Sequence, residues 1–541
     1  MDKAPPRREP RAFDGSSEVF RSHLGSLIAG CFAILLALAA PSLIGTITGS
    51  IAVKLQINGT ELTWAVSVVW LGAAAAAYLS GTLADHFGRR RVLVVSAGVL
   101  AAGEAISGFA GSVPMLCAGQ VLAGIGSGGL GAVSLAMVAA ASRNSNRRPM
   151  YLAAFAGSLS AGPIVSALLG GFLATRNSFE GAFLGLAVVA MLGMVLIQTV
   201  GANSRAERPR SIDVRGQAIL VVVLTALLFA VIQGSATRWG APLVVSAFIV
   251  TVVAAFCFVL AEKRPAAMLD LSIFRIKAFS LAAILAVVSW FVSIGSAYLF
   301  SLRLAVAQGH SPQFTAMALI LIGVVASIIG FACRPALARF AGVRALVVGG
   351  LLSFTVANLW LAWAPIENTS FALALGFVFF YAIGQVTTTA GVSAAAVNSV
   401  PAELESTAAS TQETLRVVGP PLGIAILGAV TFARSAPAFQ SRLGSLGLPP
   451  EVGHVVAEVN GHGGVLAVLG SGIGDKFPAV GQAASTALGE GIANGGYVGA
   501  VLAAIMAAIA AVFLRDNNHR AELPPHAAVV EPADRPASSH G

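Results

Sequence analysis

The feature that most constrains this chain is a series of apolar runs, each about 20 residues long, separated by short polar segments. A run of that length forms a helix that crosses the hydrocarbon core of a bilayer, and there the helix must satisfy its own backbone groups. We count fourteen such runs, at approximately 24–48, 62–82, 92–112, 115–141, 151–174, 180–201, 216–234, 241–262, 278–304, 314–333, 344–364, 369–398, 407–432 and 494–514. The sequence therefore predicts an all-α polytopic membrane protein.

The composition excludes several other classes of protein. Charged residues make up 11% of the chain and hydrophobic residues 56%, whereas soluble domains carry about 25% charged residues. A soluble enzyme or a disordered chain would need far more polar surface. The four cysteines form no Cys-x-x-Cys pair and no Cys/His ligand set. We therefore expect no disulfide scaffold, no metal site and no cofactor.

The distribution of positive charge predicts the orientation in the membrane. Of the 33 Lys and Arg residues, 25 fall on the side of the N-terminus, seven fall on the other side, and Arg416 lies in or beside a run. This bias follows the positive-inside rule and predicts both termini on the cytoplasmic side of the cell membrane. The net charge of +9 therefore reflects short basic loops rather than a surface that binds nucleic acid.

A short motif joins the second and third runs. It reads Gly81-Thr82-Leu83-Ala84-Asp85-His86-Phe87-Gly88-Arg89-Arg90-Arg91. A glycine at 81 allows close helix approach, and Gly88 permits a tight turn. Asp85 can pair with an arginine or cap a facing helix, while Arg89 and Arg90 anchor the loop on the inner side.

This motif resembles the helix 2–3 signature of the major facilitator superfamily. The resemblance implies a gate that stabilises the outward-open state, with Asp85 as its charged pivot. A weaker second copy, Leu337-Ala338-Arg339-x-Ala341-Gly342-x-Arg344, follows the tenth run and is typical of two halves related as repeats.

The whole chain from about 24 to 514 resembles the 14-helix drug:proton antiporter branch of this superfamily. The resemblance implies an N-tail (1–23), a first six-helix bundle (24–202), an extra helix pair (216–262) and a second bundle (278–514). Within the second bundle, 433–493 is expected to be an extracellular loop with short helices or a hairpin on the outer mouth. A disordered C-tail (515–541) would follow.

The sequence departs from the family in three of its motifs. No acid stands near Ala40-Pro41, where the first helix usually carries one. The usual arginine of the fourth helix is Gln120, although Gly124 and Gly126 are present. In the fifth helix Gly170-Gly171 are present, but the Gly-Pro pair lies one turn earlier, at Gly162-Pro163. These departures remove an expected proton site and shift an expected helix kink.

Few ionisable groups remain within the runs. Glu104 lies near the midplane, where it either binds a transported proton or is a neutral acid hydrogen-bonded to Ser96 or Ser107. Glu413 and Arg416 stand at i and i+3, so they can pair. We interpret them as an ion pair at the inner end of a helix, with proton coupling as the alternative role.

The expected cavity is apolar and aromatic, with Trp70, Trp290, Phe380 and Tyr381 as candidate lining residues. The sequence thus predicts a secondary transporter, not an enzyme, that exports hydrophobic or cationic small molecules by alternating access with proton coupling. The partners would be the substrate, protons and membrane lipids, and the protein would be a monomer. The alternatives are an uncoupled facilitator, a lipid or siderophore exporter, and a non-transporting membrane sensor or scaffold.

Overall fold

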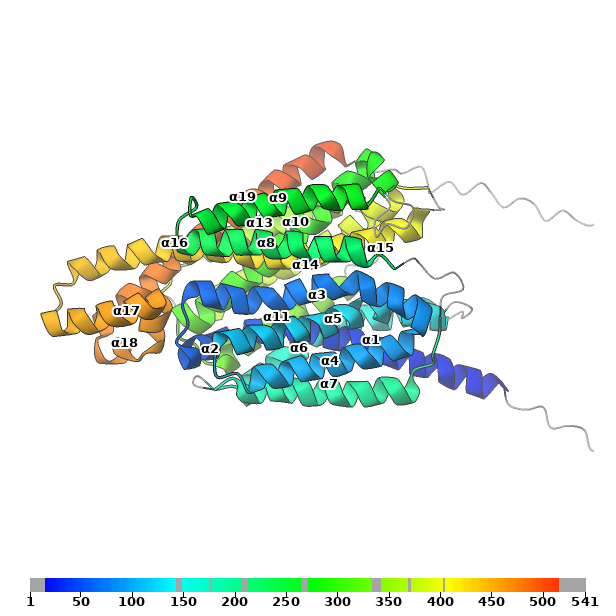
Figure 1. Ribbon diagram of the computed structural model, residues 1–541, viewed down its shortest axis with the longest axis horizontal. Helices are drawn as coiled ribbons and strands as arrows, with labels where there is room; N and C mark the ends of the chain where they lie inside the picture. The colour runs from blue at the N-terminus through cyan, green and yellow to red at the C-terminus, as the bar shows by residue number, and fades with distance from the viewer. Residues whose placement is uncertain are drawn as a thin grey trace, which may run out of the picture.

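The computed structural model is a bundle of long helices (Figure 1). It describes residues 15–142, 148–175, 178–205, 212–263, 271–332, 342–367, 371–401 and 404–514. The helices of the first part are α1 (Gly15–Thr46), α2 (Thr48–Leu55), α3 (Gly59–Phe87), α4 (Arg89–Gly108), α5 (Val113–Ser142), α6 (Arg148–Leu173) and α7 (Glu180–Val200). The central helices are α8 (Val214–Ala236) and α9 (Pro242–Ala261). The last part contains η1 (Leu271–Arg275), α10 (Lys277–Leu302), η2 (Arg303–Ala307), α11 (Pro312–Ala332), α13 (Val343–Trp363), α14 (Phe371–Asn398), α15 (Glu405–Arg416), α16 (Gly419–Ser445), α17 (Pro450–Gly470), α18 (Ile473–Lys476) and α19 (Pro478–Phe513).

The predicted membrane spans correspond to these helices. Within the described residues, thirteen helices are long and apolar enough to cross a membrane, and the shorter apolar helix Gly157–Leu173 lies within α6. Each of the fourteen predicted runs overlaps one of them. Residues 15–23, which we expected in a polar tail, already belong to α1. The predicted disordered tail, 515–541, lies outside the described residues.

The two halves of the chain repeat the same packing pattern. In the first half α1 packs on α5, α6 and α7, while α4 packs on α5 and α7. In the second half α10 packs on α14, α16 and α19, while α13 packs on α14 and α19. The fold therefore consists of two six-helix bundles, an N-half (α1–α7) and a C-half (α10–α19), related as parallel repeats.

The two halves meet along two helix pairs, α6 with α11 and α3 with α16. We call the contact between the halves the seam. The extra helix α8 covers the α3–α16 side of the seam and packs on both helices, while α9 packs outside α8. The buried Gln217 amide of α8 donates hydrogen bonds to the carbonyl oxygens of Ala75, at 2.7 Å, and Ala74, at 3.4 Å, in α3.

Residues 433–493 differ from the loop that the sequence suggested. They are mostly helical, because α16 continues to Ser445 and α19 already begins at Pro478. With α17 and α18 they extend beyond the rest of the bundle, at the end opposite to the start of α1 and the end of α19 (Figure 1). We call this the α17 end. Only a glycine readily adopts the backbone angles inside α17 at Gly464, φ 64° and ψ −155°.

Candidate functional site

Two aromatic side chains meet across the seam. Trp70 of α3 and Trp290 of α10 lie edge to face, with ring centroids 6.4 Å apart and an interplanar angle of 72°. The Arg416 guanidinium lies 4.4 Å from the centroid of the Trp290 ring, and its Nη2 is 2.6 Å from an oxygen of Glu413. We call these four residues the seam cluster, because they join an N-half helix to two C-half helices.

A break in the thirteenth span positions the charged part of this cluster. The sequence predicted one span over 407–432, and one span is present at Thr411–Ser445; within it α15 ends at Arg416 and α16 starts at Gly419, so the hydrogen-bond ladder is interrupted while Val417 and Val418 keep helical backbone angles. Pro420 and Pro421 follow, and neither has a backbone N–H that could continue the ladder of α15. Gly419 packs directly on α10, where a Cβ would meet the Val287 carbonyl and the Trp290 Cβ. The break therefore brings Arg416 onto the Trp290 ring.

The Glu413–Arg416 ion pair that the spacing predicted is present, and it is held near two aromatic rings. Trp290 is 13 residues from the start of α10, or about 20 Å along the helix axis. Trp70 is 11 residues, or about 16 Å, from the start of α3 at the α17 end. The two indole rings are thus near the middle of a hydrocarbon core about 30 Å thick.

The charged groups of the cluster are partly exposed. The side chain of Glu413 is 45% exposed and that of Arg416 is 21% exposed. A charged carboxylate that faces hydrocarbon at this depth costs at least a few kcal/mol, roughly 2.5–3.5 on insertion scales. The exposed side of Glu413 is therefore expected to face water rather than lipid.

The other two aromatic candidates lie elsewhere in the C-half. Tyr381 is buried, stacks on Phe377 at 5.3 Å, and hydrogen-bonds with the Ser293 hydroxyl at 2.9 Å. Phe380 is half-buried and packs edge to face on Phe379. Tyr381 braces α10 one turn from Trp290, so it supports the seam cluster without belonging to it.

The sequence analysis missed a polar network behind the cluster. Ser293 also donates to the Gln385 side chain, and Ser296 donates to the Asn358 side chain at 2.9 Å. Asn358 is completely buried. The signal was available, because an amide inside an apolar run must find a hydrogen-bond partner.

Glu104 lies inside the N-half, away from the seam. It is completely buried between α4 and α5, beside the side chain of Gln120. The Gln120 amide donates to the Ser107 hydroxyl at 2.9 Å, and Ser107 donates to the Gly103 carbonyl at 3.0 Å. Neither Glu104 oxygen, nor the Gln120 Oε1, has a hydrogen-bond partner among the described residues. One proton on Glu104, donated to the Gln120 Oε1, would pair that oxygen with one of the two Glu104 oxygens.

The α3–α4 loop contacts the end of α7. Gly88 has φ 101°, and a side chain there would collide with Asn203. The Arg89 amide donates to the Ser204 carbonyl at 2.9 Å, and the Arg90 guanidinium donates to the Gly201 carbonyl at 3.4 Å. Gly81 is buried and Asp85 is half-buried. Of the second copy of the motif, 337–341 lies outside the described residues, while Arg344 is exposed at the start of α13.

The motif glycines of α5 and α6 lie at close helix contacts. A Cβ on Gly124 would collide with the Val69 carbonyl of α3, and one on Gly126 with the Leu100 amide of α4. In α6, Gly162 packs on Leu35 and Gly170 on Thr46, both of α1, while Gly171 packs on Ala316 across the seam. Pro163 lies inside the helix. Most of these glycines hold each half together, and Gly171 lets the halves meet.

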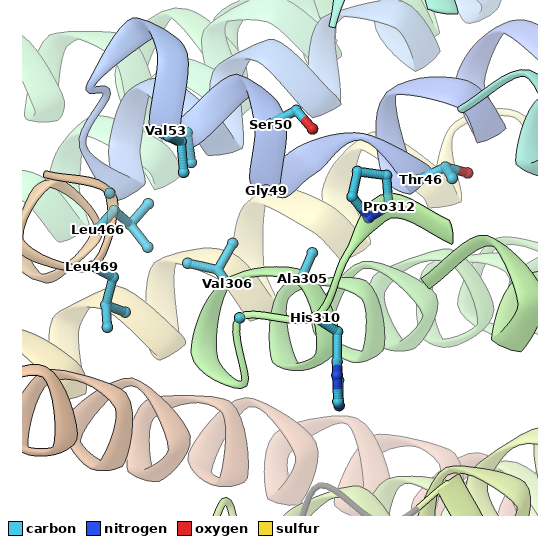
Figure 2. Close-up of a pocket in the computed structure, with 13 residues that line it drawn as sticks. Thr46, Gly49, Ser50, Val53, Ala305, Val306, His310, Pro312, Leu466 and Leu469 are labelled. Atoms are coloured by element: carbon cyan, nitrogen blue, oxygen red, sulfur yellow. The ribbon is translucent and has the colours of Figure 1, made fainter. Parts of the chain in front are cut away.

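A small pocket lies on the seam at the α17 end (Figure 2). Leu466 and Leu469 of α17 face Val53 of α2 and Val306 of η2, while the His310 ring extends away from them. His310 stacks on Phe314 with centroids 3.9 Å apart, and its Nε2 has no hydrogen-bond partner among the described residues. Burial lowers the pKa of His310. In the described part of the chain, no group of three or more His, Cys, Asp or Glu side chains could hold a metal ion.

The chain is similar in sequence to known resistance and export proteins. It is 25% identical over 440 residues to the multidrug resistance protein Stp of Mycobacterium tuberculosis (strain CDC 1551 / Oshkosh), covering 81% of each chain. It is 27% identical over 469 residues to the multidrug efflux pump LfrA of Mycolicibacterium smegmatis, covering 86% of this chain and 91% of LfrA. It is also 26% identical over 430 residues to the tetracenomycin C resistance and export protein of Streptomyces glaucescens, covering 78% of this chain and 79% of that protein.

Solved structures show the same fold. A bacterial homologue of the human lysosomal transporter Spinster, in an inward-facing conformation, matches with a TM-score of 0.60 at 16% identity, covering 91% of this chain and 97% of that one. The nucleoside transporter NupG matches with a TM-score of 0.57 at 10% identity, covering 84% of this chain and 99% of that one. The model of the Major Facilitator Superfamily matches residues 27–424. The chain belongs to the major facilitator superfamily, and it is a membrane-spanning transporter.

Proposed function

We propose that this transporter exports apolar small molecules, including cations, by alternating access. The observation that carries the proposal is the seam cluster, where two indole rings and a carboxylate meet at mid-depth between the halves. Aromatic faces and a carboxylate are the groups that recognise an apolar cation. The names of the relatives, which include a multidrug efflux pump and an export protein, support the same direction of transport.

We assign the protein to the cell membrane, with both termini in the cytoplasm and the α17 end outside, on the positive-inside rule. In this orientation the contacts at the outer end close the seam. Ser301 of α10 donates to the Gly45 carbonyl of α1, and Gly428 of α16 packs on Thr63 of α3. The arrangement supports a cycle in which these contacts separate to release the substrate.

We propose that the transport is coupled to protons and that Glu413 is the coupling acid. A coupling acid must exchange protons with water, and the Glu413 side chain is 45% exposed at the seam. Glu104 is the alternative, but it is completely buried within one half. Its geometry favours a neutral acid that holds α4 to α5 through Gln120. The substrate, protons and lipid are the expected partners, and we expect a monomer.

The test is transport by the purified full chain in proteoliposomes. Ethidium is an apolar cation and serves as the probe. Counterflow without a pH gradient reports movement through the protein, and uphill flux under a pH gradient reports coupling. We expect both. Counterflow without uphill flux would indicate a facilitator, and the absence of any flux would refute the proposed transport and favour a sensor or scaffold.

A further inference from the structure

The chain's own arginine occupies the seam cluster as a cationic ligand would. The Arg416 guanidinium lies over the Trp290 face at 4.4 Å and pairs with Glu413 at 2.6 Å. Trp70 packs edge to face with the Trp290 ring. One aromatic face and one carboxylate on a single cation are the contacts that a bound organic cation would make.

The arginine is placed so that it can leave. It is the last residue of α15, directly before the break, and its side chain is 21% exposed. Its contacts within the described part of the chain are with Glu413 and Trp290. A guanidinium on a long, flexible stem that is already partly exposed can move into water without a shift of the helix backbone.

We propose that Arg416 is a built-in substitute for the substrate, and that an apolar cation displaces it from Trp290 and Glu413. This inference rests on the proposed function. With Arg416 in place the cluster carries no net charge, so the Glu413 carboxylate has a partner before the substrate arrives. An incoming cation takes over both contacts, and the guanidinium is released into water.

The consequence is selection for apolar cations. A small hydrated cation gains little from the Trp290 face and loses its water, so it does not replace a guanidinium that is already bound. An organic cation with aromatic groups gains apolar contact with Trp70 and Trp290 as well as the ion pair. Arg416 therefore acts as a specificity-determining residue, because each ligand must outcompete it.

The test uses two ions of the same shape and opposite charge. Radiolabelled tetraphenylphosphonium binding to the purified full chain is measured by scintillation proximity, with tetraphenylborate as a competitor. In Arg416→Gln the empty position leaves Glu413 as a net negative charge, so tetraphenylphosphonium should bind about threefold to tenfold tighter and tetraphenylborate weaker. In Glu413→Gln, tetraphenylphosphonium should bind weaker and tetraphenylborate tighter than in the parent protein. Arg416→Lys should stay near the parent protein.

The matched control is the ion pair between Arg442 and Glu490, which joins α16 to α19 near the α17 end and lies outside the cluster. Arg442→Gln changes the net charge equally and should leave both affinities unchanged. If Arg416 only braces the helices, Arg416→Gln will lower the affinity for both ions alike or leave both affinities unchanged. Either result would show that the inference is wrong. Absence of saturable tetraphenylphosphonium binding to the parent protein would refute the proposed function as well. Failure of the proposed function therefore shows in the parent protein, and failure of this inference alone shows only in the variants.

Discussion

Replacement of Glu104 by glutamine tests whether this buried acid is structural or carries protons. Glutamine has nearly the same shape, and its NH2 group can donate to the Gln120 Oε1, which has no partner among the described residues. One hydrogen bond between neutral groups replaces another, so stability should change by about 1 kcal/mol or less. Glu104→Ala instead removes the side chain from a fully buried site. It should cost about 2–4 kcal/mol through the cavity and the unpaired amide.

The assay combines thermal unfolding of the purified protein with ethidium transport in proteoliposomes. We expect Glu104→Gln to melt close to the parent protein and to keep both counterflow and pH-driven uphill export. Glu104→Ala should melt clearly lower. If Glu104→Gln keeps counterflow but loses uphill export, the acid carries the coupling proton. Our interpretation of Glu104 as a neutral acid that holds α4 to α5 through Gln120 is then refuted.

Three further predictions follow from the loop, the seam and the α17 end. Asp85→Asn should insert normally but export ethidium severalfold more slowly, because the α3–α4 loop loses its charged pivot; unchanged export would refute the gating role. Glu413→Gln should weaken ethidium counterflow, because the cation loses its carboxylate partner, and should abolish pH-driven export even at saturating ethidium; retained uphill flux would place coupling elsewhere. Burial lowers the pKa of His310, so the unfolded chain binds more protons at this residue and the folded state loses stability as the pH falls below about 6.5. His310→Gln should therefore reduce the drop in melting temperature between pH 7.5 and 5.5. A drop as large as that of the parent protein would contradict this.

The location of the helices could be predicted from the sequence because the bilayer imposes a length on each apolar run. The i, i+3 ion pair was predictable for a similar reason, since it depends only on local helix geometry. Residues 433–493 were harder. Their glycines suggested a loop, yet tertiary packing of buried residues such as Val465 and Val468 overrides this weak local preference.

The seam cluster could not be assembled from the sequence. The Gly419-Pro420-Pro421 string marks a helix break, and we could have used it to divide the thirteenth run. It does not say which ring Arg416 would contact, because Trp290 lies 126 residues earlier in the chain. The contact depends on how α15 and α16 pack against α10.

The position of the extra helix pair adds a constraint on any movement of the halves. α8 is joined to α3 by directional contacts, the hydrogen bonds from Gln217 and the pairing of Phe229 with Trp64 at 6.2 Å. Its contact with α16 is apolar, because Leu228 and Ile232 pack with Ala425, Ala429, Leu422 and Ile426. Under the proposed cycle, α8 should therefore move with the N-half and slide along α16, so the α3–α16 side of the seam stays covered while the α6–α11 side is free to open.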